Sequence, residues 1–140
     1  MRLIILGAGG YGRTVADVAA QTGQFGEISF LDDNSTAADA IGKCAEFERF
    51  RDGQTAFYPA FGNNEGRLKW LYHLREADCA IPAIIHPTAY VSPTTRIEAG
   101  TVILPTRLLI PAARPKLDAS SIVGPSSIMA AYWKRAYTSV

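Results

Sequence analysis

The sequence is poor in the residues that build disulfide frameworks and metal clusters. Its 140 residues include only two cysteines, Cys44 and Cys79, and two histidines, His73 and His86. Two isolated cysteines do not form a disulfide scaffold, and neither histidine has further ligands at metal-binding spacing. We therefore expect no metal site, and two reduced, buried thiols in a cytoplasmic protein.

Strong net charge and long apolar runs are also missing. The formal net charge is +1, so the charge does not favour a nucleic acid or an anionic membrane as a partner. No apolar run approaches the roughly 20 residues of a membrane span. The apolar start, residues 1–6, is too short for the core of a signal peptide and runs into glycines. Hydrophobic residues still make up 48% of the chain, enough for a core.

Strand-like and helix-like patterns alternate over the first 86 residues. Short aliphatic or β-branched runs predict strands, and apolar residues at helical spacing predict helices. The strands are expected at residues 3–6, 27–31, 55–61 and 83–85, and the helices at residues 13–21 and 65–77, with residues 35–53 ambiguous. This alternation predicts an α/β fold with a small, Rossmann-like sheet of about four parallel strands.

The second helix shows which of its residues should face the core. Leu68 and Leu71, with Leu74 or Ala77, form one apolar stripe, whereas Arg67 is expected elsewhere and His73 at the surface. For His86, which precedes a proline at a strand end, a structural role is favoured over catalysis.

A glycine loop lies between the first strand and the first helix. In Gly7-x-Gly9-x-x-Gly12 the first glycine permits a tight turn, the second lets the backbone approach a phosphate, and the third allows close helix packing. Asp32 follows 20 residues later at the end of the second strand, where a carboxylate can accept hydrogen bonds from a ribose or a base. The alternative is a structural turn without a ligand.

Polar residues follow the third strand at the same expected edge of the sheet. Gly62, Asn63 and Asn64 precede the second helix, and ligands of open parallel sheets bind at the carboxyl ends of the strands. The asparagine side chains suit a polar ligand, but they also suit a turn and a helix N-cap. Both interpretations can hold together.

Aliphatic residues recur every six positions at Val91, Ile97 and Ile103. A six-residue period with one inward aliphatic per side is typical of a β-helix built from short parallel strands. The period lasts for about one coil, whereas solenoids need roughly three repeats for stability.

These motifs, in this order, resemble the PglD/NeuD-type sugar acetyltransferases of bacterial sialic acid and bacillosamine pathways. The resemblance covers residues 1–105 and is carried by Leu6-Gly-Ala-Gly-Gly-Tyr-Gly12, Phe30-Leu-Asp-Asp33, Ala60-Phe-Gly-Asn-Asn64, Ile85-His-Pro-Thr-Ala-Tyr-Val-Ser-Pro93 and the hexads. It implies a Rossmann-like sugar-nucleotide domain at residues 1–86 and the first coil of a left-handed β-helix at residues 87–105. Such enzymes form trimers and bind acetyl-CoA between neighbouring β-helices.

The resemblance also assigns residue roles. Gly7, Gly9, Gly10 and Gly12 would hold the phosphates, Asp32 and Asp33 would face the nucleoside, and Gly62, Asn63 and Asn64 would border the sugar. Tyr11 stands where the family often has histidine, which bears on the finer sugar contacts. The family uses a histidine of the β-helix as general base, and this chain has no histidine after His86. We therefore expect no catalytic residue, no bound acetyl-CoA, no proper trimer and no activity from this chain alone.

Residues 106–140 depart from the hexads, and the genetic code suggests why. Reading their codons from the third base forces glycine at 129–130, an aliphatic residue at 131–132, leucine at 132–133 and glutamate at 133–134. Residues 127–129 permit His-His or Asp-His in that frame. We infer that a frame change near residues 105–106 replaced the β-helix with an aberrant tail; the alternative is divergence into a new C-terminus.

Two other functions remain open. A dinucleotide-binding redox or sensor domain would use the same glycine loop with Asp32 on the adenosine ribose. A non-catalytic interaction module would pair the open edge of its unfinished β-helix with another chain. The hexads argue against the redox domain, which would need more sheet or a substrate domain after Pro87.

Overall fold

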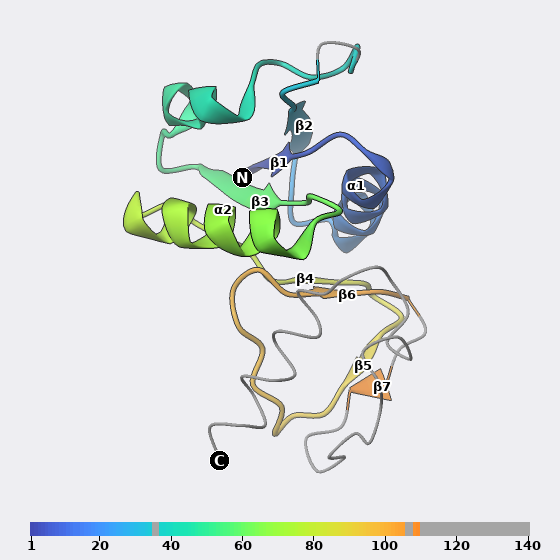
Figure 1. The fold of residues 1–140 in the computed structure, drawn as a ribbon. Coiled ribbons are helices and arrows are strands. Elements are labelled where there is room, and N and C mark those ends of the chain that lie inside the picture. The colour runs from blue at the N-terminus through green and yellow to red at the C-terminus, as the bar shows by residue number, and fades with distance from the viewer. Residues whose placement is uncertain (35–36, 106–107, 110–140) are drawn as a thin grey trace.

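The computed structural model describes residues 1–34, 37–105 and 108–109 (Figure 1). Its first part is a three-stranded parallel sheet in the order β2-β1-β3. The elements are β1 (Arg2–Leu6), α1 (Gly10–Thr22), β2 (Glu27–Leu31), a 3-10 helix (Cys44–Phe50), β3 (Thr55–Pro59) and α2 (Asn64–Glu76). The predicted α/β class is confirmed, and the ambiguous segment contains the 3-10 helix.

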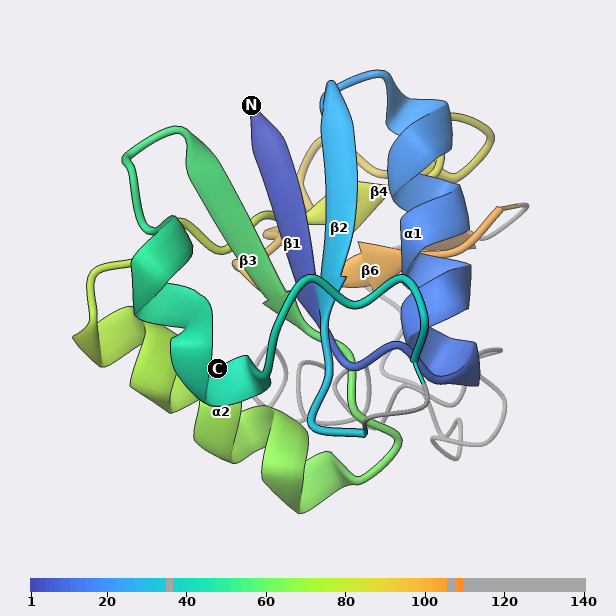
Figure 2. The same ribbon diagram turned by 90° about the horizontal axis from the view of Figure 1, so that it is seen from above.

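Alternating side chains of the central strand supply two apolar layers. Leu3 and Ile5 pack with Val15 of α1 on one face, and Ile4 and Leu6 pack with Leu74 of α2 on the other. The 3-10 helix covers the second face beside α2, so the sheet lies between two helical layers (Figure 2). Burial on both faces explains why β1 is a continuous aliphatic run rather than an alternating one.

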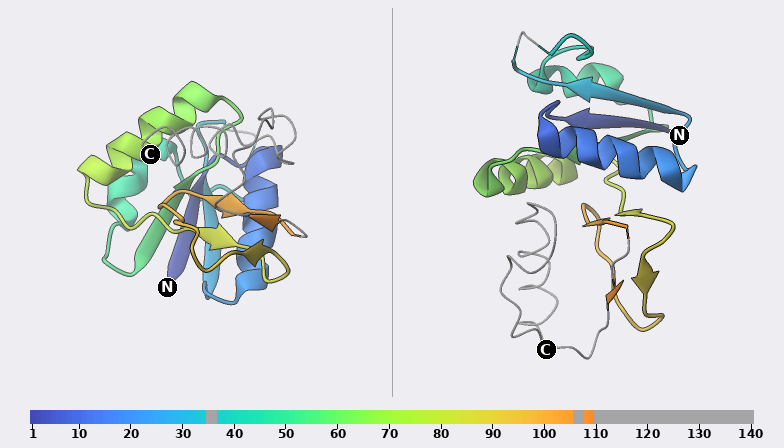
Figure 3. Two further views of the ribbon diagram at one scale, coloured as in Figure 1. Left: turned by 90° about the horizontal axis from the view of Figure 1, so that it is seen from below. Right: turned by 90° about the vertical axis from the view of Figure 1, so that its right-hand side faces the viewer.

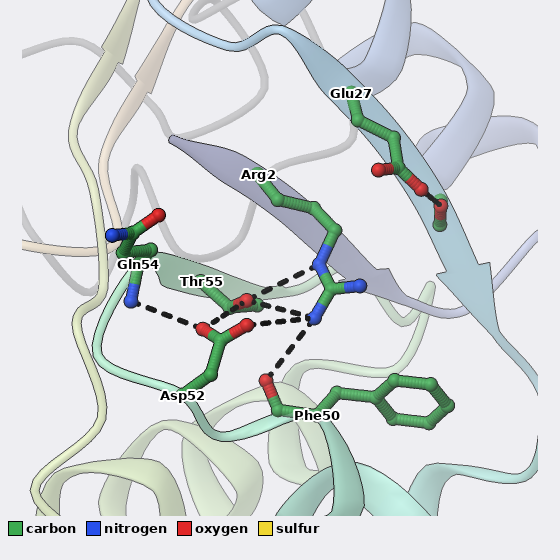
Figure 4. A network of polar contacts seen from close by, with 7 residues as sticks. Arg2, Glu27, Phe50, Asp52, Gln54 and Thr55 are labelled. Carbon is green, nitrogen blue, oxygen red and sulfur yellow. Dashed lines mark hydrogen bonds and ion pairs between the residues drawn. The ribbon is translucent and has the colours of Figure 1, made fainter.

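A polar network joins the amino end of β1 to the start of β3 (Figure 4). The Arg2 guanidinium donates to Thr55 Oγ1 at 3.0 Å and pairs with Asp52 at 3.3 Å. Thr55 Oγ1 in turn donates to Asp52 Oδ1 at 2.7 Å. Hydrogen bonds from Thr55 and the Gln54 backbone, with the charge of Arg2, lower the pKa of Asp52. This network closes the end of the sheet away from the candidate site.

The expectation of about four strands in one sheet was wrong. A single bridge joins Ala56 to Ala80, and the chain then reaches Pro82, which has no N–H to donate. Beyond it, β4 (Ile84–Ile85) pairs in parallel with β6 (Val102–Ile103) instead of extending the first sheet. The sequence pattern identified the strand but not its partner.

The second pair of short strands repeats the same offset. β5 (Tyr90–Val91) pairs in parallel with β7 (Leu108–Leu109), and in both pairs the partners are 18 residues apart. This segment lies below the first sheet in the side view (Figure 3). Ile85, on β4, lies six residues before Val91 in the sequence, so its spacing matches the predicted six-residue period.

Side-chain hydrogen bonds fix the first sheet and its helices to this segment. His86 is 7% exposed and joins Gln21 of α1 through Nε2 at 2.7 Å and Thr88 Oγ1 through Nδ1 at 2.8 Å. This is the structural role expected for His86.

His73 is exposed on α2, as expected. Of the two free cysteines, Cys44 is buried and Cys79 is half-buried. No helix of the described ranges is long and apolar enough to cross a membrane.

Candidate functional site

Three loops meet at the carboxyl edge of the sheet. Leu6 is in register with Leu31 on one side and with Pro59 on the other, so the loops after β1, β2 and β3 leave the sheet at one level. The glycine loop is in the middle because β1 is the central strand. The parallel topology thus brings together the predicted phosphate, nucleoside and sugar residues.

Two of the loop glycines are required by the fold. Gly7 has φ +107°, and a Cβ there would lie 2.9 Å from the carbonyl oxygen of Ala60. A Cβ on Gly12 would lie 2.0 Å from the carbonyl oxygen of Gly7, which no real structure tolerates. Gly7 lets the loop approach Ala60 after β3, and Gly12 lets α1 approach Gly7 and β1, which accounts for the first and third glycines of the motif.

The other two loop glycines face open space. A Cβ on Gly9 or Gly10 would meet nothing within 4 Å. The fold therefore gives no steric reason for the absence of side chains at these positions. An approaching ligand would supply one, because only a bare backbone lets a phosphate come into hydrogen-bonding distance.

The first turn of α1 has the electrostatic character of an anion site. Gly9 is the N-cap and provides no side-chain cap, and the first backbone bond of the helix runs from Arg13 N to Gly9 O at 3.0 Å. The N–H groups before Arg13 therefore have no acceptor within the helix. No acidic residue lies in this turn, so no side chain of the helix itself neutralises the positive end of its dipole.

The two aspartates after β2 brace the loops around them. Asp32 accepts a hydrogen bond from Ala8 N at 2.6 Å and another from Asn34 N at 2.7 Å. Asp33 accepts one from Cys44 N at 3.1 Å. Asp32 thus fixes the glycine loop directly against the end of β2. A contact of either carboxylate with a nucleoside stays a prediction.

The asparagines after β3 begin α2. Asn63 Oδ1 accepts from Glu65 N at 2.8 Å and Gly66 N at 3.2 Å, so the N-cap interpretation is confirmed. Asn64 Oδ1 lies 3.4 Å from the Arg67 guanidinium. Gly62 has open space where a Cβ would be. The proposed sugar contacts of these residues stay predictions.

The side chain of Tyr11 turns into the protein beneath the loop. It is 8% exposed, and its hydroxyl lies 3.1 Å from that of Tyr58, which donates to Gly100 O at 3.1 Å. Burial raises the pKa of Tyr11 and raises that of Tyr58 further. The phenol therefore supports the loop from within, and the predicted substrate contact of Tyr11 would be made by its backbone.

Arg67 was expected away from the apolar face of α2, and this prediction was wrong. Its side chain is fully buried, donates to Phe61 O at 2.9 Å and lies 5.3 Å from the Tyr11 ring centroid. Burial lowers the pKa of its guanidinium. The signal was its position four residues before Leu71 and seven before Leu74, on the apolar stripe itself. Leu71 and Leu74 are buried as predicted, whereas Leu68 is only half-buried.

Comparison with known proteins gives one family and a consistent set of structures. The family described as the PglD N-terminal domain matches residues 2–74. The acetyltransferase domain of PglB from Neisseria gonorrhoeae FA1090 is 34% identical, with a TM-score of 0.71 over 76% of this chain and 55% of that one. The same domain has been solved in complex with acetyl coenzyme A, with 33% identity and a TM-score of 0.71 over 76% and 54% of the two chains.

A more distant structure agrees in fold. A point mutant of perosamine N-acetyltransferase from Caulobacter crescentus, in complex with CoA and GDP-perosamine, has a TM-score of 0.70 at 23% identity. The match covers 77% of this chain and 53% of that one. At this identity the match shows the fold alone. The chain spans about half the length of the solved structures it matches.

Proposed function

Because this chain belongs to the PglD N-terminal domain family, we propose that it binds the sugar-nucleotide substrate of an acetyl-CoA-dependent acetyltransferase. The chain is a relative of sugar N-acetyltransferases. The observation that carries the proposal is the open first turn of α1, where Gly9 and Gly10 leave room for a ligand and the helix N–H groups face it.

The arrangement of the three loops supports one orientation of the bound sugar nucleotide across the edge of the sheet. The diphosphate would bind at Gly7, Gly9, Gly10 and Gly12, with the N–H of Tyr11 in the same turn. The nucleoside would lie toward Asp32 and Asp33, and the sugar toward Gly62, Asn63 and Asn64. The acceptor would be a nucleotide-activated amino sugar or a sialic acid-type sugar.

The segment from β4 to β6 would be the start of a left-handed β-helix. The 18-residue offset between paired strands supports this, because three sides of six residues make 18. Residues 87–105 would complete the first coil, and residues 106–140, which lie almost wholly outside the described residues, would be the aberrant tail. The Rossmann-like part, predicted as residues 1–86, would end before β4, because β4 pairs with β6 and not with the first sheet.

This chain would keep the substrate-binding half of the enzyme without its chemistry. In the full-length family a histidine of the β-helix would remove a proton from the attacking amine or hydroxyl. This sequence has no histidine after His86, and His86 is bonded to Gln21 and Thr88. The chain would therefore bind no acetyl-CoA, transfer no acetyl group and not form the family's trimer.

Ligand titration tests the proposal. The 140-residue chain is titrated calorimetrically with a UDP-amino sugar, GDP, NAD and CoA. We expect heat of binding and a raised melting temperature with the sugar nucleotide, and neither effect with CoA. Binding of NAD without binding of the sugar nucleotide would favour the redox alternative. Acetyl transfer by the purified chain would contradict the proposal that it binds the substrate without catalysing the reaction.

A further inference from the structure

Arg13 lies on the first turn of α1 with its guanidinium plane held by three hydrogen bonds. Nε donates to the carbonyl oxygen of Ala8 at 3.2 Å. Nη1 and Nη2 donate to the two carboxylate oxygens of Asp39, the second at 2.7 Å. This fork-shaped pairing fixes the orientation of the plane, because the guanidinium donors lie within it.

One face of this plane is covered, although the side chain as a whole is half exposed. The covered face lies over the ring of Phe30 on β2, with Arg13 Cζ 4.6 Å from the ring centroid. Phe30 is 7% exposed, so this ring is a buried support. The Arg13 side chain is nevertheless 49% exposed. A flat cation that is held at its edge and backed by a ring offers its other face to a planar group.

The position of Arg13 matches the nucleoside end of the proposed ligand. Ala8, whose carbonyl oxygen binds Arg13, also donates its N–H to Asp32. Arg13 and Asp32 therefore contact the same residue of the glycine loop. Phe30, under the guanidinium, lies on β2, two residues before Asp32, which follows the strand.

We propose that Arg13, backed by Phe30 and oriented by Asp39, is the platform on which the nucleobase of the substrate stacks. This inference rests on the proposed function and deepens it, because it assigns the residue that distinguishes a nucleotide from a simple phosphate. The Asp39 bond raises the pKa of Arg13, and the same bond lowers the pKa of Asp39. Both charges therefore persist at neutral pH.

An edge-on phosphate contact makes a different prediction. A ligand phosphate that paired with Arg13 would compete with Asp39, and a lysine could replace the arginine as a point charge. A stacked base needs the plane, which lysine lacks. Arg13→Lys and Arg13→Gln therefore separate the two roles.

The experiment compares these variants with a matched control. Arg49 is another exposed arginine in an ion pair, with Glu46 at 2.6 Å within the 3-10 helix. Wild type, Arg13→Lys, Arg13→Gln and Arg49→Gln are titrated with UDP and with inorganic pyrophosphate, and their melting temperatures are measured. Exposed ion pairs contribute little to stability, so all four proteins should remain folded.

We expect both Arg13 variants to bind UDP about 5- to 10-fold more weakly than wild type, and pyrophosphate equally well. Arg49→Gln should match wild type for both ligands. Full UDP affinity in Arg13→Lys, or an equal loss for UDP and pyrophosphate, would overturn the stacking role. If wild-type protein bound neither UDP nor a UDP-amino sugar, the proposed function itself would fail, and that outcome is distinct from the others.

Discussion

Gly9 and Gly10 would each meet no atom within 4 Å if they carried a Cβ, whereas a Cβ on Gly12 would lie 2.0 Å from a backbone oxygen. One short motif therefore combines residues that the fold needs with residues that the fold leaves free. The distinction matters for function, because a purely structural turn would need no glycine at the free positions. Substitution by alanine separates the two cases.

Gly12→Ala should lower the free energy of unfolding by about 3 kcal/mol or more, because the methyl group must displace the loop or the helix. Gly10→Ala should leave that free energy almost unchanged and weaken binding of a UDP-amino sugar about 10-fold or more, because the methyl group occupies the phosphate space. Urea denaturation and calorimetric titration measure the two effects. Unaltered binding by a folded Gly10→Ala variant would favour the structural turn.

Cys44 gives a second prediction at this scale. Its thiol is fully buried; burial, and then the nearby charges of Asp33 and Asp32, raise its pKa from 9.0 to about 12. At pH 8 it should stay protonated and unreactive toward a thiol reagent until the protein unfolds. In a Cys79→Ser background, labelling should therefore require urea, and rapid labelling of the native protein would contradict the burial of Cys44.

The same shift sets a pH dependence. A pKa raised in the folded state means that the contribution of Cys44 is fully present below pH 9 and is lost as pH rises from about 9 to about 12. Unfolding free energies measured across this window should fall less steeply for Cys44→Ala than for the parent protein. If the unfolding free energy depended on pH identically in both proteins, the raised pKa of Cys44 would be contradicted.

At the scale of elements, buried hydroxyl groups connect three parts of the fold. Tyr58 on β3 donates to Gly100 O between β5 and β6, so its oxygen accepts from Tyr11 on α1. Gly100 has φ +82° and is itself buried, which allows its carbonyl to point inward. The glycine loop is thereby coupled to the segment that follows the first sheet.

Tyr58→Phe should lower the free energy of unfolding by about 2 kcal/mol or more, because it leaves both the Tyr11 hydroxyl and the Gly100 carbonyl without this partner. Tyr11→Phe is the matched control. It keeps the ring that Arg67 lies against and removes only one bond, so its cost should be about 1 kcal/mol. A smaller loss for Tyr58→Phe than for Tyr11→Phe in urea denaturation would contradict this order of donors.

Local patterns predicted these elements better than their partners. The helices begin at Gly10 and Asn64, one to three residues before the predicted starts: the Asn63 side chain caps α2, and α1 begins with glycines that carry no apolar spacing. Strand β4 was recognised as a strand, but two aliphatic residues near a proline carry no information about which sheet they join. Its partner β6 is 18 residues away, and only the repeat of that offset identifies it.

The site shows the same division between local and tertiary information. The three loops could be predicted to meet, because consecutive parallel strands end at one edge of a sheet. The burial of Arg67 could not be predicted by treating charge as a surface signal, since backbone carbonyls and an aromatic ring surround it in the tertiary structure. Arg13 also carried no sequence signal, because its partner Asp39 is 26 residues away.

At the scale of the whole molecule, the described fold contains a three-stranded parallel sheet with its helices and two pairs of short parallel strands that share an 18-residue offset. The matched PglB domain extends well beyond this similarity, since the match covers 55% of it. Residues 106–140 stand where further repeats would be expected, but only Leu109 continues the six-residue period, and the next position of the period holds Pro115. A frame change near residues 105–106 would account for both facts.

Sequencing the gene tests this explanation at positions where the residue read in the alternate frame depends on which synonymous codon is used. The glycine, leucine and glutamate implied by residues 129–134 follow from any codons, so they decide nothing by themselves. The informative positions are residues 106–128 and the nucleotides after the codon for Val140. We expect the alternate frame there to stay open, to repeat an aliphatic residue every six positions, and to encode histidine at residues 128–129. A stop codon, or an open frame without the period, would favour a genuinely divergent C-terminus.

A protein with the frame restored after residue 105 extends the test from the gene to the molecule. If the first coil ends in register with β6, the added hexads should stack at the same 18-residue offset, and each should cover the strand edge of the coil before it. The product should bind acetyl-CoA, sediment as a trimer and transfer acetyl groups to a UDP-amino sugar, whereas the 140-residue chain should bind only the sugar nucleotide. Histidine-to-alanine substitution at the restored position should abolish transfer while leaving sugar-nucleotide binding intact. If the restored protein bound the sugar nucleotide but neither acetyl-CoA nor further copies of itself, the frame-change explanation would be contradicted. The proposal that this chain binds the sugar nucleotide would be unaffected.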